Sequence, residues 1–210
     1  MAYDWLNGTK DALIYIGDPL CSWCYGIAPQ LDQLKEELKD TDFRLVMGGL
    51  RPFNQEKAID MADFLKEHWV EIGERTQQPF SFDILEDPNF VYDTEPPSRA
   101  TVVVRTMQPA LELDFFKAIQ HAFYAENKDT NELSTYLSLA RKFELDLVEF
   151  EANYHSEQLK TVTKNDFQLA QDMGIRGFPS LVYKKGTDLH LVANGFDTAE
   201  NIKNRILNLR

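Results

Sequence analysis

The only two cysteines of the chain form the motif Cys21-Ser22-Trp23-Cys24, at the point where a short apolar segment gives way to an amphipathic pattern. Residues 12–17 are apolar and end in a Gly-Asp-Pro turn, which is typical of a short buried strand. From Trp23 to Leu38 apolar side chains recur at spacings of three and four, which indicates a helix that begins near the cysteines. Two thiols at a strand-to-helix junction predict an α/β fold and make disulfide exchange the leading functional hypothesis.

Composition and charge exclude several classes of partner. The 210 residues are 43% hydrophobic, enough to bury a sizeable core. A formal net charge of -12 argues against a protein that neutralises nucleic-acid phosphates, and no segment is apolar enough to span a membrane, so we expect neither partner. The first 18 residues contain Asp4 and Asp11 and no signal-peptide core, which predicts a cytoplasmic location. In that compartment a disulfide is more often catalytic or regulatory than structural.

Three zones follow one another along the chain. The first is a strand, helix and strand, the second strand being Phe43 to Met47 and ending at Gly48-Gly49. The middle zone carries helical periods for about five helices, with residues 80–92 as a loop. The last zone has a helix near residues 166–173, strands at 180–183 and 189–193 joined as a hairpin, and a closing helix whose Asp197 and Glu200 are spaced as a capping box.

This order resembles a thioredoxin fold split by a helical domain, the architecture of the DsbA family of thiol-disulfide oxidoreductases. Three signatures carry the resemblance: the Cys-Ser-Trp-Cys motif at a helix start, Pro29 five residues after Cys24, and Gly177-Phe178-Pro179-Ser180 ahead of the third strand, similar to the family's cis-proline loop. The resemblance implies a thioredoxin-like domain (βαβ then ββα) at residues 1–51 and 163–210, interrupted by an all-helical insertion domain at 52–162. The Asp-Pro-x-Cys-x-Trp-Cys-Tyr-Gly stretch is most similar to the cytoplasmic, predicted disulfide-isomerase branch of that family.

The chemistry of exchange assigns different roles to the two cysteines. A helix start provides unpaired N–H groups and partial positive charge that stabilise a thiolate. Cys21, the earlier residue, is expected to attack, and Cys24, one turn later and deeper in the fold, to resolve the mixed disulfide. Lowering a cysteine pKa from about 8.5 to about 7 requires roughly 2 kcal/mol, which helix-end interactions and one hydrogen bond can supply.

The residues around the thiols are candidates for tuning them. Strongly oxidising family members place Pro-His between their cysteines, whereas Ser22-Trp23 brings no positive charge. We therefore predict a less acidic nucleophile and a reduction potential nearer that of thioredoxin, a hypothesis that fails if Cys21 titrates near about pH 4. Asp18, three residues before Cys21, either adds a negative charge that raises the pKa of the thiol or simply ends the strand and caps the turn.

Substrate contacts are implied mainly by the resemblance. A cis Pro179 is expected against Cys21, with the backbone of Phe178 pairing with an extended substrate segment by strand addition. Trp23 is either a hydrophobic lip over the disulfide or a helix-packing residue. We expect partners that are protein or small-molecule disulfides and thiols, with a recycling reductant or oxidant; the sequence predicts no particular oligomeric state.

No metal and no cofactor beyond the dithiol itself are expected, although glutathione is a candidate co-substrate. A zinc site needs two further ligands, and the four histidines show no paired spacing. Two alternatives to exchange stay open. One is a glutathione-dependent transferase or isomerase of the kappa-class type, which the intact cysteine pair counts against; the other is a noncatalytic adaptor that uses the fold as a protein-binding surface.

Overall fold

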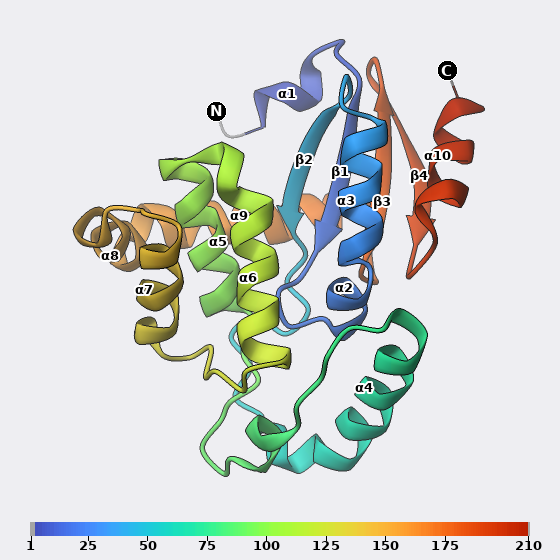
Figure 1. Ribbon diagram of the computed structural model, residues 1–210. Coiled ribbons are helices and arrows are strands. Elements are labelled where there is room, and N and C mark those ends of the chain that lie inside the picture. Colours follow the sequence, from blue (N-terminus) through green and yellow to red (C-terminus); the bar gives the residue numbers. More distant parts are fainter. Residues whose placement is uncertain (1–2, 210) are drawn as a thin grey trace.

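A four-stranded sheet organises the chain, whose computed structural model describes residues 3–209 (Figure 1). Its strands are β1 (Ala12–Gly17), β2 (Asp42–Met47), β3 (Ser180–Lys185) and β4 (Asp188–Asn194), in the order β2-β1-β3-β4. Strand β1 pairs in parallel with β2 and antiparallel with β3, and β3 pairs antiparallel with β4. This confirms the predicted thioredoxin-like order of βαβ followed by ββα.

Most of the remaining chain is helical, and none of the helices within residues 3–209 is long and apolar enough to cross a membrane. The helices are α1 (Asp4–Asn7), α2 (Ser22–Gly26), α3 (Ala28–Glu37), α4 (Ala62–Thr76), α5 (Glu95–Met107), α6 (Glu112–Tyr124), α7 (Leu133–Lys142), α8 (Leu147–His155), α9 (Glu157–Asp172) and α10 (Ala199–Leu207), with short 3₁₀ turns at Ala58–Met61, Asp83–Glu86 and Pro109–Leu111. The proposed domain boundary at residue 162 falls inside α9, which runs through it without a break.

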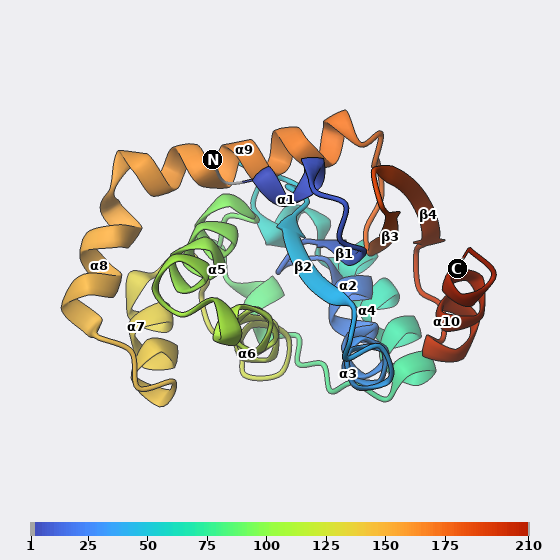
Figure 2. The same ribbon diagram turned by 90° about the horizontal axis from the view of Figure 1, so that it is seen from above.

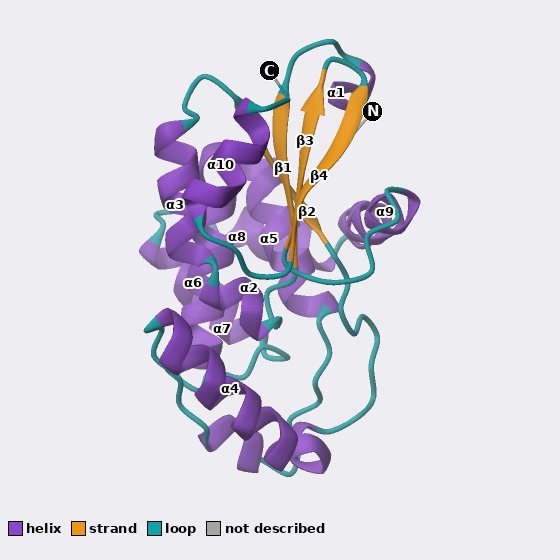
Figure 3. Cartoon of the chain, turned by 90° about the vertical axis from the view of Figure 1, so that its right-hand side faces the viewer, coloured by secondary structure: helices purple, strands orange, loops and turns teal. Residues whose placement is uncertain are grey.

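Helices cover both faces of the sheet. In Figure 3 the sheet is seen almost edge-on, with α9 on one side and α3 and α10 on the other. Because side chains alternate along a strand, Leu13 and Tyr15 of β1 join the core on the α3 side, while Ile14 and Ile16 join the core on the α9 side. Figure 2 shows α5 to α8 gathered beyond the β2 edge and α10 beyond β4.

The helix predicted to start at the cysteines is divided in two at Ile27. Pro29 is the second residue of α3 and has no N–H to donate. The chain therefore closes α2 with the Ile27 N–H donating to the Trp23 carbonyl at 3.0 Å, and α3 begins with the Gln30 N–H donating to the Ile27 carbonyl at 2.8 Å. The break leaves a single short turn of helix, α2, to carry the cysteines.

The predicted capping box of the last helix is wrong. Thr198, not Asp197, is the N-cap of α10, and its hydroxyl accepts from the Asn201 N–H at 3.3 Å. Asp197 instead pairs with Arg205, with its carboxylate 2.6 Å from Nη2. An adjacent threonine and aspartate compete for the same cap, and spacing alone did not separate them.

A largely buried ion cluster fastens the helices to the β2 edge of the sheet. Arg105 of α5 forms a bidentate pair with Asp166 of α9, at 2.9 and 2.6 Å, and also contacts Glu112 at 2.6 Å. Burial alone lowers the pKa of the Arg105 guanidinium, but the two carboxylates outweigh this and raise it. The guanidinium also donates to the Leu45 carbonyl at 3.0 Å, and Asp166 accepts from the Met47 N–H at 2.9 Å, so both helices are bonded to β2.

We expect Asp166→Asn to lower the free energy of unfolding by about 3 kcal/mol, because it removes the charge of a fully buried carboxylate from its partly buried Arg105 partner. Urea unfolding followed by circular dichroism measures this. Lys160→Ala, which removes an exposed ion pair with Glu157, is the matched control and is expected to change stability by less than about 1 kcal/mol. Equal, small effects of the two substitutions would show that the cluster does not hold the helices.

Candidate active site

The two cysteines lie where the loop after β1 enters α2. Cys21 is the N-cap residue, with an extended backbone (φ -89°, ψ 115°), and Cys24 lies inside the helix. Both are free thiols, and Cys21 is 7% exposed whereas Cys24 is 0% exposed. The N-cap position places Cys21 beside the N–H groups that a helix leaves unpaired in its first turn. A substrate can therefore approach Cys21 but not Cys24.

A second loop, the one before β3, lies directly against Cys21. The Phe178–Pro179 peptide bond in this loop is cis, the conformation that the family resemblance implies. The Cys21 thiol donates to the Phe178 carbonyl with an Sγ to O distance of 3.5 Å. Pro179 is buried, and its carbonyl accepts from the Gly195 N–H at 2.7 Å. The proline loop is thus held between the nucleophile and the segment after β4.

Gly48, the first residue after β2, makes room for the Phe178 ring. A Cβ atom at this position would lie 2.2 Å from the ring, so only glycine fits. The Gly48 N–H donates to the Gly17 carbonyl at 2.7 Å, which fixes the glycine next to the end of β1. The sequence indicated Gly48 only as the end of a strand, although a glycine directly after a buried strand is a signal of close backbone approach.

The Tyr15 side chain lies beside Cys24 on the inner side of the site. Its ring folds over Gly17, where a Cβ atom would be 2.5 Å away. Burial raises the pKa of the Tyr15 hydroxyl well above its ordinary value, and the neighbouring Cys24 raises it further. Burial also raises the pKa of the Cys24 thiol, and its interaction with Cys21 adds to this. Cys24 is consequently a protonated thiol at neutral pH.

Asp18 is fully buried between the loop after β1 and the loop after β2. Its carboxylate accepts from the Leu20 N–H at 2.9 Å and from the Leu50 N–H at 2.7 Å. Burial raises the pKa of Asp18 to about 6, although these two hydrogen bonds act in the opposite direction. The contacts match the capping role considered for Asp18, and they extend it, because the carboxylate also ties down the loop after β2. Its effect on the thiolate stays a prediction.

Trp23 is half-buried at the mouth of the site. Its ring lies edge-on to His68 of α4 at 6.2 Å between centroids and is tilted against Phe196 at 5.8 Å. The guanidinium of Arg75, also on α4, lies 5.4 Å from the centre of the indole ring. Trp23 therefore packs against both the helical insertion and the segment after β4, and sequence patterns did not reveal these partners.

The structure brings the sequence-predicted site residues together at one end of the sheet. Cys21 is the N-cap of α2, Trp23 and Cys24 lie inside that helix, and Phe178 and Pro179 come from the loop before β3. Asp18 lies in the loop after β1, three residues before Cys21. Ser22 is half-buried and forms no hydrogen bond to either thiol in the described part of the chain. The individual roles of these residues stay predictions. Tyr15, Gly48, Arg75 and Phe196 join the site only through tertiary contacts.

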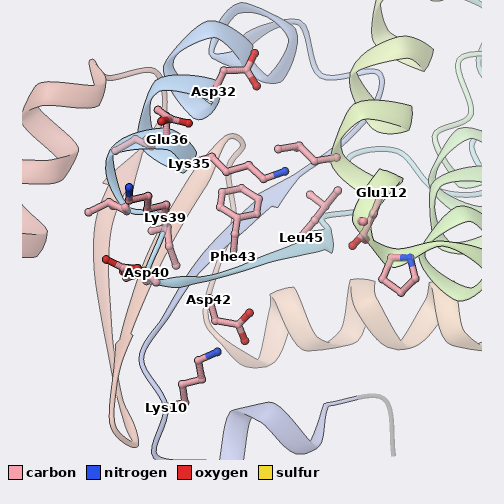
Figure 4. A pocket seen from close by; sticks show the side chains of 17 residues that line it. Lys10, Asp32, Lys35, Glu36, Lys39, Asp40, Asp42, Phe43, Leu45 and Glu112 are labelled. Atoms are coloured by element: carbon pink, nitrogen blue, oxygen red, sulfur yellow. The ribbon is translucent and has the colours of Figure 1, made fainter. Parts of the chain in front are cut away.

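A groove of about 570 Å³ lies elsewhere, between α3, the start of β2 and α6 (Figure 4). Its apolar floor includes Phe43 and Leu45, and charged residues surround it. Three of its carboxylates are already paired: that of Asp32 with Lys117, that of Asp42 with Arg44 and that of Glu112 with Arg105. Neither cysteine nor the proline loop contributes to its lining, so the groove is not part of the dithiol site.

The fold and the site together define a thioredoxin-fold protein with a dithiol at a helix start facing a cis-proline loop. A family model described as Thioredoxin matches residues 106–204. Among solved structures, a candidate protein disulfide isomerase from Nitrosomonas europaea is 32% identical, with a TM-score of 0.86, and the match covers 95% of this chain and 97% of that one. The cytosolic disulfide reductase DsbM from Pseudomonas aeruginosa is 26% identical, with a TM-score of 0.78 and coverage of 95% and 98%; it has also been solved with GSH.

Curated relatives are more distant. The ClpXP adapter protein SpxH from Halalkalibacterium halodurans is 25% identical over 174 residues, which is 79% of this chain and 56% of that protein. The chain spans little more than half the length of the curated relatives it matches. More remote structures, such as oxidoreductase DsbA from Xylella fastidiosa at 12% identity and a TM-score of 0.62, share the fold. The chain belongs to the DsbA family of thioredoxin-fold thiol-disulfide oxidoreductases.

The raised pKa of Asp18 predicts a pH dependence of stability. An unfolded aspartate titrates near about 3.9, so between about pH 4 and pH 6 the folded protein binds more protons than the unfolded chain and stability falls as pH rises. We expect the free energy of unfolding of the wild type to fall by roughly 2 to 3 kcal/mol between about pH 4 and pH 7 for this reason. The Asp18→Asn variant is expected to lack this decrease. Urea unfolding of both proteins from pH 4 to 7 measures the difference. Parallel stability curves would show that Asp18 does not titrate in this range.

Proposed function

We propose that the chain catalyses thiol-disulfide exchange on protein or small-molecule disulfides, with Cys21 attacking and Cys24 resolving. The observation that carries this proposal is the placement of Cys21 at a helix N-cap, with its thiol 3.5 Å from the Phe178 carbonyl and a buried Cys24 three residues later. The arrangement gives one reachable sulfur that is bonded to the proline loop and one protected sulfur behind it. A metal site or a structural disulfide does not need this asymmetry.

The proposed reaction has two exchange steps. The Cys21 thiolate attacks one sulfur of a substrate disulfide, a bond forms between Cys21 Sγ and that sulfur, and the other substrate sulfur leaves as a thiolate that takes a proton from solvent. Cys24 then gives up its proton and attacks Cys21 Sγ, which releases the second substrate thiolate. Two electrons have passed to the substrate, and the protein holds a Cys21–Cys24 disulfide that an external thiol reductant reopens.

The direction that we propose is reduction or isomerisation in the cytoplasm. Ser22 and Trp23 supply no cation to hold a thiolate, which disfavours a strong oxidant. The relatives support the same direction, since DsbM is described as a cytosolic disulfide reductase and was solved with GSH. Glutathione is therefore a candidate recycling reductant or co-substrate.

A substrate is proposed to bind in an extended conformation along the proline loop. The loop runs directly into β3, and the backbone of Phe178 lies two residues before the first residue of that strand. An extended peptide that pairs with this backbone places its sulfur next to Cys21. The half-buried ring of Trp23 then acts as an apolar lip on the other side of the thiol.

A second candidate function is that of an adaptor, which the matches to SpxH favour. An adaptor binds its partner through noncovalent contacts and does not need the dithiol. The two functions therefore differ in whether capture of a partner depends on Cys21.

We expect Cys24→Ala to accumulate mixed disulfides, because the resolving thiol is missing while Cys21 still attacks. Extracts carrying this variant, resolved without reductant and analysed by mass spectrometry, are expected to show partners bonded to Cys21 and released by dithiothreitol. Cys21→Ala is the matched control and is expected to capture nothing covalently. Absence of any releasable adduct would contradict exchange. Equal noncovalent capture of the same partners by the folded double variant Cys21→Ala/Cys24→Ala would favour the adaptor.

A further inference from the structure

Arg75 is an exposed cation held in a fixed place at the mouth of the dithiol site. It lies in the last turn of α4, and its guanidinium carbon is 5.4 Å from the centre of the Trp23 ring and 5.1 Å from the centre of the Phe196 ring. Contacts of a guanidinium with two aromatic rings restrict it without neutralising its charge. Within residues 3–209 no carboxylate forms an ion pair with Arg75, including Glu71 one turn earlier on α4.

Both aromatic partners of Arg75 adjoin the segments that carry or contact Cys21. Trp23, on which it rests, stands between the two cysteines in the motif. Phe196, its other aromatic partner, follows Gly195, whose N–H donates to the Pro179 carbonyl at 2.7 Å. In the same proline loop, the Phe178 carbonyl accepts a hydrogen bond from the Cys21 thiol. Arg75 therefore contacts two residues that adjoin the Cys21 site, although it comes from the helical insertion.

Arg75 carries a positive charge that no carboxylate of the described residues offsets, in a chain whose net charge is negative. The chain carries a net charge of -12, which repels anionic substrates in general. Five other arginines are paired with carboxylates: Arg44, Arg51, Arg99, Arg105 and Arg205. Arg141 and Arg176 resemble Arg75 in forming no ion pair within residues 3–209, but only Arg75 rests on Trp23 of the cysteine motif. A guanidinium whose face is covered by rings still presents its N–H groups at the edge, and these match the geometry of a carboxylate.

We propose that Arg75 binds a carboxylate of the substrate while the substrate sulfur meets Cys21. This inference rests on the proposed exchange function and narrows its substrate class to thiols and disulfides with a carboxylate close to the sulfur. Such a carboxylate has two sources, free glutathione or an acidic residue beside a cysteine in a peptide. The chemistry that Arg75 recognises is the same in both.

The test compares three small disulfides that differ in charge: dianionic 3,3′-dithiodipropionate, neutral bis(2-hydroxyethyl) disulfide and dicationic cystamine. The measured quantity is the second-order rate constant for oxidation of the reduced Cys21/Cys24 pair by each. We expect Arg75→Ala to lower the ratio of the dianionic to the neutral rate constant by about tenfold, the size of one charge-assisted contact at a partly exposed site. Arg75→Glu is expected to lower the ratio further and to favour cystamine, and Arg75→Lys to restore it in part.

Arg141→Ala, which removes an exposed arginine from the distant α7, is the control and is expected to leave all three rate constants unchanged. The same rate constants are measured with glutathione disulfide and with two peptide disulfides that carry Glu or Gln beside the cysteine. The substrate that Arg75→Ala slows identifies the source of the carboxylate. Equal slowing of the three small disulfides by Arg75→Ala would overturn the proposal and leave Arg75 as a packing partner of Trp23. Failure of all three to oxidise the wild-type pair would instead refute the exchange function itself.

Discussion

The antiparallel pairing of β1 with β3 is the constraint on which the site depends. Ile16 near the end of β1 lies opposite Ser180 at the start of β3, so the loop that leaves one strand and the loop that enters the other meet at the same end of the sheet. The first loop leads to Cys21 and the second contains Phe178 and Pro179. Residues 157 positions apart are thereby brought to hydrogen-bonding distance, with the thiol against a backbone carbonyl. Without this register the cysteine motif would be an ordinary helix start.

The helical insertion adds side chains of α4 to the site that the sheet forms. Its attachment to the sheet is electrostatic as well as apolar, since Arg105 and Asp166 bond α5 and α9 to the backbone of β2. A second apolar cluster, centred on Trp69, packs α4 beneath α2. Through α4 the insertion places His68 and Arg75 on Trp23, so the surface around a neutral Ser-Trp dipeptide gains a cation from a remote part of the chain.

Sequence patterns predicted the parts of the fold that depend on short-range order. The buried strand at residues 12–17 coincides with β1, and the cysteine motif and the Phe178–Pro179 loop stand where the thioredoxin-like order required them. Helix α9 starts at Glu157, earlier than the helix expected near residue 166, because Ser156 provides its cap and its apolar face continues into the predicted insertion.

Features that depend on contacts between distant segments could not be predicted. Gly48 is required because the ring of a residue 130 positions later occupies the space of its Cβ atom, and no local pattern contains that information. Arg105 was indistinguishable from a helix-surface cation until its two carboxylate partners and the β2 edge surrounded it. The same is true of Arg75, whose role follows from two aromatic rings on other elements.

The most direct measurement of the exchange role is an equilibrium redox titration of the Cys21/Cys24 pair against glutathione buffers, with the disulfide detected by mass spectrometry after thiol trapping. A Cys21–Cys24 disulfide is predicted to form reversibly in a single two-electron transition, with a potential nearer to the thioredoxin value of about -270 mV than to the DsbA value of about -120 mV. A pair that forms no internal disulfide at any poise, or one as oxidising as DsbA, would contradict a reductase or isomerase built on this dithiol.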